Sequence, residues 1–249
     1  MSTKAGTSVT VVSEPTRAAL GRRAGTHAGQ VLRAALRDGG RARVMLAAAP
    51  SQSATLATLA RAEGIDWTRV ELFHMDEYVG LPPGAPQGFA TWLAANFVRH
   101  TPGAAFHRID PGGDPQAEAE RYEALLGTEP FDLVLLGLGV NGHLAFNDPP
   151  ADLDDPLAVR VVALDAASRR QQVEEGHFAT LDDVPTTAVT VTIPRLLNAG
   201  AVIASVPGRA KRTAVAQTLG EPIGPMHPGT ALRTHPGVTL YVDAEADPR

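Results

Sequence analysis

Short apolar runs alternate with longer amphipathic stretches along most of the chain. Residues 133–136 are continuously apolar, which is typical of a strand buried on both faces of a sheet. Residues 15–37 carry apolar side chains at helical spacing, and Pro15 suits the first turn of a helix. The same patterns predict strands at residues 8–12, 43–49, 70–74, 159–164, 186–193, 201–206 and 238–242, and helices at residues 54–62, 88–98, 117–126, 166–175 and 209–219. This alternation predicts an α/β fold with a mostly parallel sheet covered by helices on both faces.

The chain of 249 residues is long enough for one domain with a sizeable core. No internal repeat, low-complexity tract or linker interrupts it. Beyond Pro150 the alternating pattern loosens. We therefore expect a single α/β domain over residues 1–249, with residues 150–185 as a candidate lid segment.

A glycine-rich turn follows the apolar run at residues 133–136. Gly137, Gly139 and Gly142 let the backbone turn sharply and let a ligand approach closely, and His143 follows at once. Open α/β sheets build their ligand sites at such strand ends. An imidazole titrates near neutral pH and suits proton transfer, and Asp148 is near enough in sequence to orient it. The alternative is a turn histidine that hydrogen-bonds to the backbone.

Two carboxylates, Asp76 and Glu77, follow the predicted strand at residues 70–74. A carboxylate at the carboxyl end of a buried strand points toward the ligand site of this fold class and serves there as an acid or base. The alternative is a pair of solvated loop acids.

Two strand-to-helix turns are candidate anion sites. In residues 49–53, Ser51 is expected to cap the following helix, and such a turn offers N–H groups and hydroxyls to a phosphate. After the strand at residues 201–206, Gly208 leads to Lys211 in the same geometry. Arg169 and Arg170 are a further candidate anion clamp. For each feature the alternative is an ordinary cap or a solvated surface cation.

Composition excludes several classes of protein. The formal net charge is −5, which gives no basic surface for nucleic acid. The chain has no cysteine, and its histidines lack the spacing of metal ligands, so we expect neither a disulfide nor a metal site. No apolar run is long enough to cross a membrane, and the first residues lack the apolar core of a secretory signal. We therefore expect a cytoplasmic protein without a membrane or nucleic-acid partner.

Two segments resemble the signatures of one enzyme family. Residues 73–81, FHMDEYVGL, and residues 137–149, GLGVNGHLAFNDP, resemble the two signatures of glucosamine-6-phosphate deaminases. The resemblance implies a Rossmann-like sheet shared with sugar-phosphate isomerases and coenzyme A transferases. It also implies isomerisation and deamination of glucosamine 6-phosphate, or a close hexosamine phosphate, to fructose 6-phosphate and ammonia, without a cofactor or metal.

The resemblance assigns roles to individual residues. Asp76 matches the base that carries a proton between C2 and C1 of the opened sugar, and His143 matches the group that helps to open the ring. Asn141 and Asp148 match flanking positions of the catalytic set, the latter usually glutamate in the family. The substrate-binding residues that we expect are Ser51, Gln52, Ser53, Glu77, Gly142, Arg169 and Lys211.

The chain departs from the family in the turn after the second strand. Residues 49–53 read Ala-Pro-Ser-Gln-Ser, where the family commonly carries Pro-Thr-Gly-Gly-Thr. The family's phosphate arginine has no clean counterpart, and Arg169, with Arg170 as the alternative, is the candidate for it.

Two other functions fit the same residues. One is hydrolysis of a phosphosugar lactone, the reaction of 6-phosphogluconolactonases, which share the fold. The other is a non-catalytic sugar-phosphate sensor, although no basic helix-turn-helix extension precedes residue 8. In each case the expected partner is a small sugar phosphate, and a homo-oligomer is compatible with the sequence.

Overall fold

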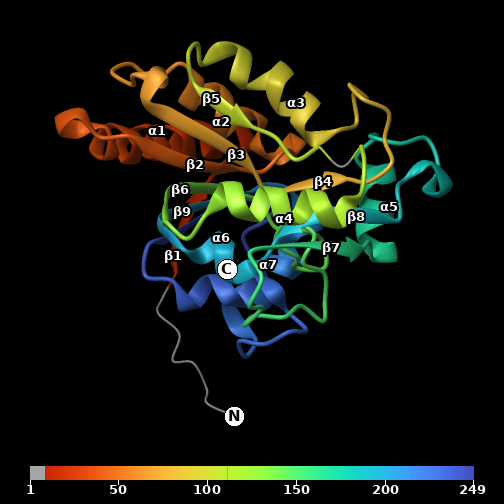
Figure 1. Cartoon of the computed structure of the whole chain (residues 1–249). Helices are drawn as coiled ribbons and strands as arrows, with labels where there is room; N and C mark the ends of the chain where they lie inside the picture. The colour runs from red at the N-terminus through yellow and green to blue at the C-terminus, as the bar shows by residue number, and fades with distance from the viewer. Residues whose placement is uncertain (1–8, 111) are drawn as a thin grey trace.

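Seven parallel strands form the central sheet of the structure, a computed structural model that describes residues 9–110 and 112–249. From edge to edge the strands are β1 (Thr10–Glu14), β10 (Val238–Asp243), β9 (Ala199–Val206), β6 (Phe131–Leu136), β2 (Ala42–Leu46), β3 (Val70–His74) and β5 (Ala105–His107). The chain builds β2, β3 and β5 outward on one side, and then β6, β9 and β10 on the other (Figure 1). The order in which the chain adds strands therefore reverses between β2 and β6. Folds of this type open a crevice for ligands at such a position.

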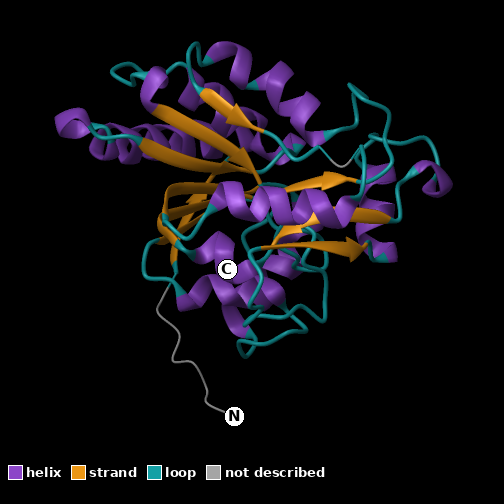
Figure 2. Ribbon diagram, in the orientation of Figure 1, coloured by secondary structure: helices purple, strands orange, loops and turns teal. Residues whose placement is uncertain are grey.

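Helices cover both faces of this sheet (Figure 2). One apolar core joins the sheet to α1 (Arg17–Ala35), α2 (Ser53–Ala60) and α3 (Phe89–Asn96). The other joins it to α4 (Pro115–Leu126), α6 (Ile193–Leu197) and α7 (Arg212–Gly220). Within β6, Leu133 and Leu135 belong to the first core, and Val134 and Leu136 belong to the second. The α/β prediction, with a mostly parallel sheet buried on both faces, is confirmed.

A second sheet of three strands was not expected from the sequence. It consists of β4 (Asp76–Tyr78), β8 (Thr187–Val191) and β7 (Val159–Ala163), which pair antiparallel. It lies beside α5 (Ala166–Glu174) at one end of the central sheet (Figure 1). Only Met75 separates β3 from β4, so the chain passes from one sheet directly into the other.

Two glycines set the distance between α1 and α2. A Cβ at Gly21 would lie 2.2 Å from the Cβ of Ala54, and one at Gly25 would lie 2.5 Å from the Cβ of Thr58. The helices can therefore approach this closely only because these side chains are absent. The contact fixes where α2 begins, and with it the turn after β2.

Several element boundaries differ from the sequence predictions. Ser51 does not cap α2: it lies in a 3-10 turn over Pro50–Gln52, and the residue before the helix is Gln52. The first strand begins at Thr10, while Ser8 lies outside the described residues. The short elements β4, β5 and α6 were missed. None of the helices in the described ranges combines the length and the apolar character needed to cross a membrane.

Candidate active site

A cavity opens where β2, β3 and β6 end, beside the point at which the strand order reverses. Among the side chains that line it are Ser51, Asp76, His143, Glu175, His177 and Lys211. They come from the turn after β2, from β4, from the turn after β6, from the end of α5 and from the turn after β9. Four residues predicted from the sequence, namely Ser51, Asp76, His143 and Lys211, therefore share one cavity.

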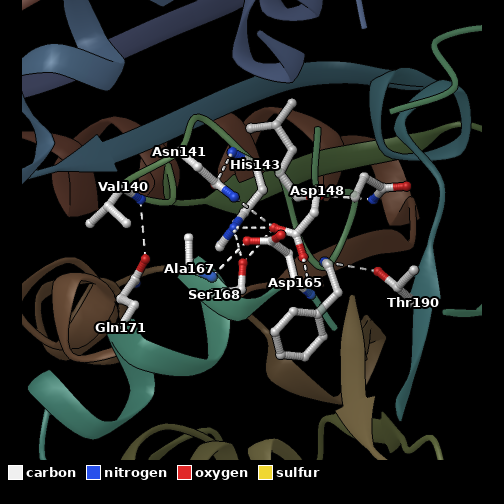
Figure 3. A network of polar contacts seen from close by, with 12 residues as sticks. Val140, Asn141, His143, Asp148, Asp165, Ala167, Ser168, Gln171 and Thr190 are labelled. Carbon is white, nitrogen blue, oxygen red and sulfur yellow. Dashed lines mark hydrogen bonds and ion pairs between the residues drawn. The ribbon is translucent and has the colours of Figure 1, made fainter. Parts of the chain in front are cut away.

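His143 is held by a network of polar side chains (Figure 3). Its Nδ1 lies 2.9 Å from Oδ1 of Asp148 and 2.8 Å from Oγ of Ser168. Ser168 also donates to Asp148, and Asn141 does so through Nδ2 at 3.0 Å. The Oδ1 of Asn141 accepts the backbone N–H of His143 at 3.1 Å. Asn141 and Asp148 therefore position the imidazole from one side.

The carboxylate of Asp148 fixes the state of the ring. Burial raises the pKa of Asp148, but hydrogen bonds and charge from His143, with further hydrogen bonds from Asn141 and Ser168, outweigh it and bring the pKa down to about 2. An ionised carboxylate accepts the Nδ1 proton of His143, which leaves Nε2 for the cavity. Such a ring is arranged for proton exchange with a ligand.

The glycine turn brings the backbone against this ring. A Cβ at Gly139 would lie 2.4 Å from the ring atoms of His143, so no larger residue fits there without displacing the imidazole. Gly142 has a φ of +85°, and its carbonyl accepts the N–H of Gly229 at 2.8 Å. Gly142, expected to bind substrate, is not among the lining residues and instead forms the turn.

Asp76 is the buried carboxylate of the cavity. It is 8% exposed, and burial, with a smaller contribution from the charge of Glu77, raises its pKa well above the ordinary value. Its carbonyl oxygen lies 2.9 Å from Nδ1 of His74, whose Nε2 accepts the N–H of Ile109 at 2.8 Å. Burial lowers the pKa of His74 to about 4, so this histidine is neutral and donates through Nδ1. It anchors the strand that presents Asp76.

Glu77 points away from the cavity, contrary to the expectation that it binds substrate. Its Oε1 accepts the backbone N–H groups of Tyr78 and Phe89, each at 3.0 Å, and Oε2 accepts that of Ala90 at 2.8 Å. Helix α3 has Gly88 at its N-cap and so lacks a capping side chain of its own. Glu77 supplies that cap from a different strand.

The anion-site candidates Lys211 and Ser51 line the same cavity. Lys211 ends a 3-10 turn over Arg209–Lys211 and is 8% exposed. Burial lowers its pKa, and the charge of Glu175 opposes that effect. Ser51 lines the same cavity, and its Oγ accepts Nε2 of Gln52 at 3.0 Å.

Neither Gln52 nor Ser53 lines the cavity, although both were expected to bind substrate. Gln52 is fully buried and also donates to the carbonyl of Ser205 at 3.1 Å. Ser53 begins α2 with its side chain exposed. Of the three polar residues in the turn after β2, only Ser51 therefore lines the cavity.

The arginine expected at the phosphate is absent from the cavity. Arg169 donates to the carbonyls of Leu181 and Val184, at 2.6 and 3.1 Å, and so holds the loop that follows α5. Arg170 is exposed and does not line the cavity either.

Five polar residues of the site, all from the segment around α5, were not predicted from the sequence. Ser168 contacts His143, and the cavity is lined by Gln171, Gln172, Glu175 and His177. Helix α5 reads AASRRQQVE and has no apolar stripe to reveal which of its faces is buried. Within the described ranges, no three His, Cys, Asp or Glu side chains are grouped as metal ligands.

The arrangement combines groups for proton transfer with a cation in the same cavity. A carboxyl of raised pKa and an imidazole with Nε2 available face a single cavity, and such a pair can move protons to and from a bound ligand. Lys211 supplies a positive charge to an anionic part of that ligand.

Comparison with known proteins identifies relatives of the whole chain. A family model described as glucosamine-6-phosphate isomerases/6-phosphogluconolactonase matches residues 15–241. The glucosamine-6-phosphate deaminase of Halothermothrix orenii is 34% identical over 195 residues, which cover 77% of this chain and 79% of the relative. That of Streptococcus pneumoniae is 33% identical over 183 residues, covering 73% and 77%.

Solved structures show the same relationship. A monomeric glucosamine-6-phosphate deaminase superposes with a TM-score of 0.87 at 26% identity, covering 96% of this chain and 98% of that one. A 6-phosphogluconolactonase from Shewanella baltica superposes with a TM-score of 0.79 at 17% identity, covering 95% and 98%, and so shares the fold. Because the family model spans most of the sequence and both deaminases exceed 30% identity, the chain belongs to the glucosamine-6-phosphate isomerase/6-phosphogluconolactonase family.

Proposed function

We propose that this protein converts glucosamine 6-phosphate, or a close hexosamine phosphate, and water to fructose 6-phosphate and ammonia. The observation that carries the proposal is that Asp76, His143 and Lys211 line one cavity. The deaminase relatives named above add support, since they match most of the chain.

The geometry suits a sequence of proton transfers. Nε2 of His143 receives the proton of the anomeric hydroxyl and returns it to the ring oxygen, so that the pyranose opens. Asp76 takes the proton from C2 and delivers it to C1 through an enolamine. Water then replaces the resulting imine nitrogen, and ammonia leaves. The raised pKa of Asp76 suits a base that must accept and release a proton in successive steps.

The remaining site residues position these groups. Asn141, Asp148 and Ser168 orient His143 through the network described above. Lys211 and Ser51 line the cavity and would contact the anionic group of the sugar phosphate. We further propose one domain for the whole chain, with residues 150–185 acting as a lid, since they supply α5 and its cavity-lining side chains. The absence of cysteine supports action in the cytoplasm.

Ammonia release is the direct test. Glucosamine 6-phosphate, galactosamine 6-phosphate and a 6-phosphogluconolactone are assayed in parallel with the purified chain. Ammonia from a hexosamine phosphate supports the proposal and identifies the preferred epimer. Lactone hydrolysis without ammonia release would replace it with the second candidate, 6-phosphogluconolactonase, which the same family model covers. Tight binding of the sugar phosphate without turnover of any substrate would indicate a sensor.

A further inference from the structure

A carboxylate already lies beside Lys211, where an anion is expected to bind. Oε1 of Glu175 lies 3.8 Å from Nζ of Lys211, and the two side chains are 28% and 10% exposed. Both residues line the same cavity as Asp76 and His143. The positive charge of Lys211 is therefore opposed before any ligand arrives.

Neighbouring side chains hold this carboxylate in place. Nε2 of Gln171 donates to Oε1 of Glu175 at 2.7 Å. Oε1 of Gln171 accepts the backbone N–H of Val140 at 3.1 Å (Figure 3). Nε2 of His177 lies 3.7 Å from Oε2 of Glu175. Burial raises the pKa of Glu175, but hydrogen bonds from His177 and Gln171 and the charge of Lys211 outweigh it and lower the pKa. Glu175 is thus ionised at neutral pH and tied to the turn that carries His143.

No second permanent cation compensates for it. Among the described residues that line the cavity, Lys211 is the only lysine or arginine. A phosphate monoester carries a charge near −2 at neutral pH. At Lys211 it would lie within a few ångströms of the Glu175 carboxylate and be repelled by it. A hydroxyl group at the same position meets an acceptor in Glu175 and a donor in Lys211.

We propose that Glu175 is a specificity-determining residue that weakens binding of the phosphate dianion at Lys211 and extends the activity to the unphosphorylated amino sugar. The C6 hydroxyl of that sugar donates to the Glu175 carboxylate and accepts from the Lys211 ammonium. The inference rests on the proposed function and refines its substrate class from hexosamine phosphates to hexosamines with or without the phosphate.

The test compares E175Q with the wild type and with the control E174Q. Glu174 lies on α5 but not among the cavity-lining residues. For each variant, ammonia release gives kcat and KM for glucosamine 6-phosphate and for free glucosamine. In E175Q, kcat/KM is expected to rise about tenfold for the phosphate, through KM, and to fall for free glucosamine. E174Q should leave the ratio of the two unchanged.

Two kinetic results would overturn the inference. One is an equal change for both substrates in E175Q, which a purely structural role would give. The other is a wild type that releases ammonia from the 6-phosphate and none from free glucosamine.

A binding experiment separates this inference from the proposed function. If the wild type releases ammonia from neither sugar, the proposed function fails, but calorimetry with inorganic phosphate still tests Glu175 because it needs no turnover. Phosphate binding about tenfold tighter to E175Q than to the wild type supports the role of Glu175. Equal or weaker binding to E175Q rejects it.

Discussion

Replacing Asp76 by asparagine removes the proposed base while it preserves the size of the side chain. A positioned general base contributes about 10²- to 10⁴-fold to a rate. We therefore expect D76N to lower kcat for ammonia release by that factor, which corresponds to about 3–5 kcal/mol of transition-state stabilisation. Because Lys211, the expected partner of the phosphate, is unchanged in D76N, the variant should still bind the sugar phosphate.

The same variant should not lose stability near neutral pH. Burial, with the charge of Glu77, raises the pKa of Asp76 in the folded state. Between the ordinary aspartate pKa of about 3.9 and that raised value, the folded state binds more protons than the unfolded state, so the free energy of unfolding falls as pH rises. The amide of D76N does not ionise. D76N should therefore melt at or above the wild-type temperature at pH 7, and the difference should shrink toward pH 4.

Three measurements together test this reasoning. Ammonia release gives the rate, calorimetry with glucosamine 6-phosphate gives the binding, and thermal unfolding at pH 7 and pH 4 gives the stability. In the wild type, activity should also decline on the acid side through a pKa well above that of an ordinary aspartate, because the base must be ionised. Near wild-type turnover by a stable D76N would refute the role of Asp76.

Three further variants probe other parts of the site. D148N should lower kcat. Near pH 7 it should also lower the free energy of unfolding by about 2 kcal/mol, because the pKa of Asp148 is lowered to about 2 in the folded protein. The wild type has this extra stability in full above about pH 4 and loses it as the pH falls through 2. Urea unfolding at pH 7 that matches the wild type would contradict it. K211M should raise KM for glucosamine 6-phosphate about tenfold or more, and an unchanged KM would place the phosphate elsewhere. G139A should displace His143, since the added Cβ would lie 2.4 Å from its ring, and lower kcat together with a stability loss of about 1–3 kcal/mol; wild-type kcat would show that the turn can adjust.

Sequence patterns predicted the parts of the fold that depend on continuous burial. Residues 133–136 of β6 are all apolar and helices cover both faces of the strand, so the pattern is visible without a structure. The second sheet was missed for the opposite reason. Its strand β4 is three residues long and contains two carboxylates, so it has neither the length nor the alternation that signals a strand.

Residues that reach the site from strand ends were predictable, and those from α5 were not. Asp76 follows β3 closely and His143 lies in the turn after β6, and the topology alone brings such positions together. Helix α5 is mostly polar, so its sequence gives no sign that Ser168 contacts His143 and that Gln171 lines the cavity. It gives no sign either that Arg169 is turned toward the loop at Leu181. Which face of a polar helix is buried depends on tertiary contacts that the sequence pattern does not encode.

An insertion that shifted β4 by one residue against β8 would rearrange the site. Neighbouring residues of a strand face opposite ways, and here one carboxyl group enters the cavity while the next holds the start of α3. Sliding β4 by one position against β8 would exchange these two tasks. The glutamate, longer by one methylene, would then reach into the sugar pocket, and the amides of Phe89 and Ala90 would lose their acceptor. The register of the three residue pairs between β4 and β8 thus determines both which carboxyl group enters the cavity and which one caps α3.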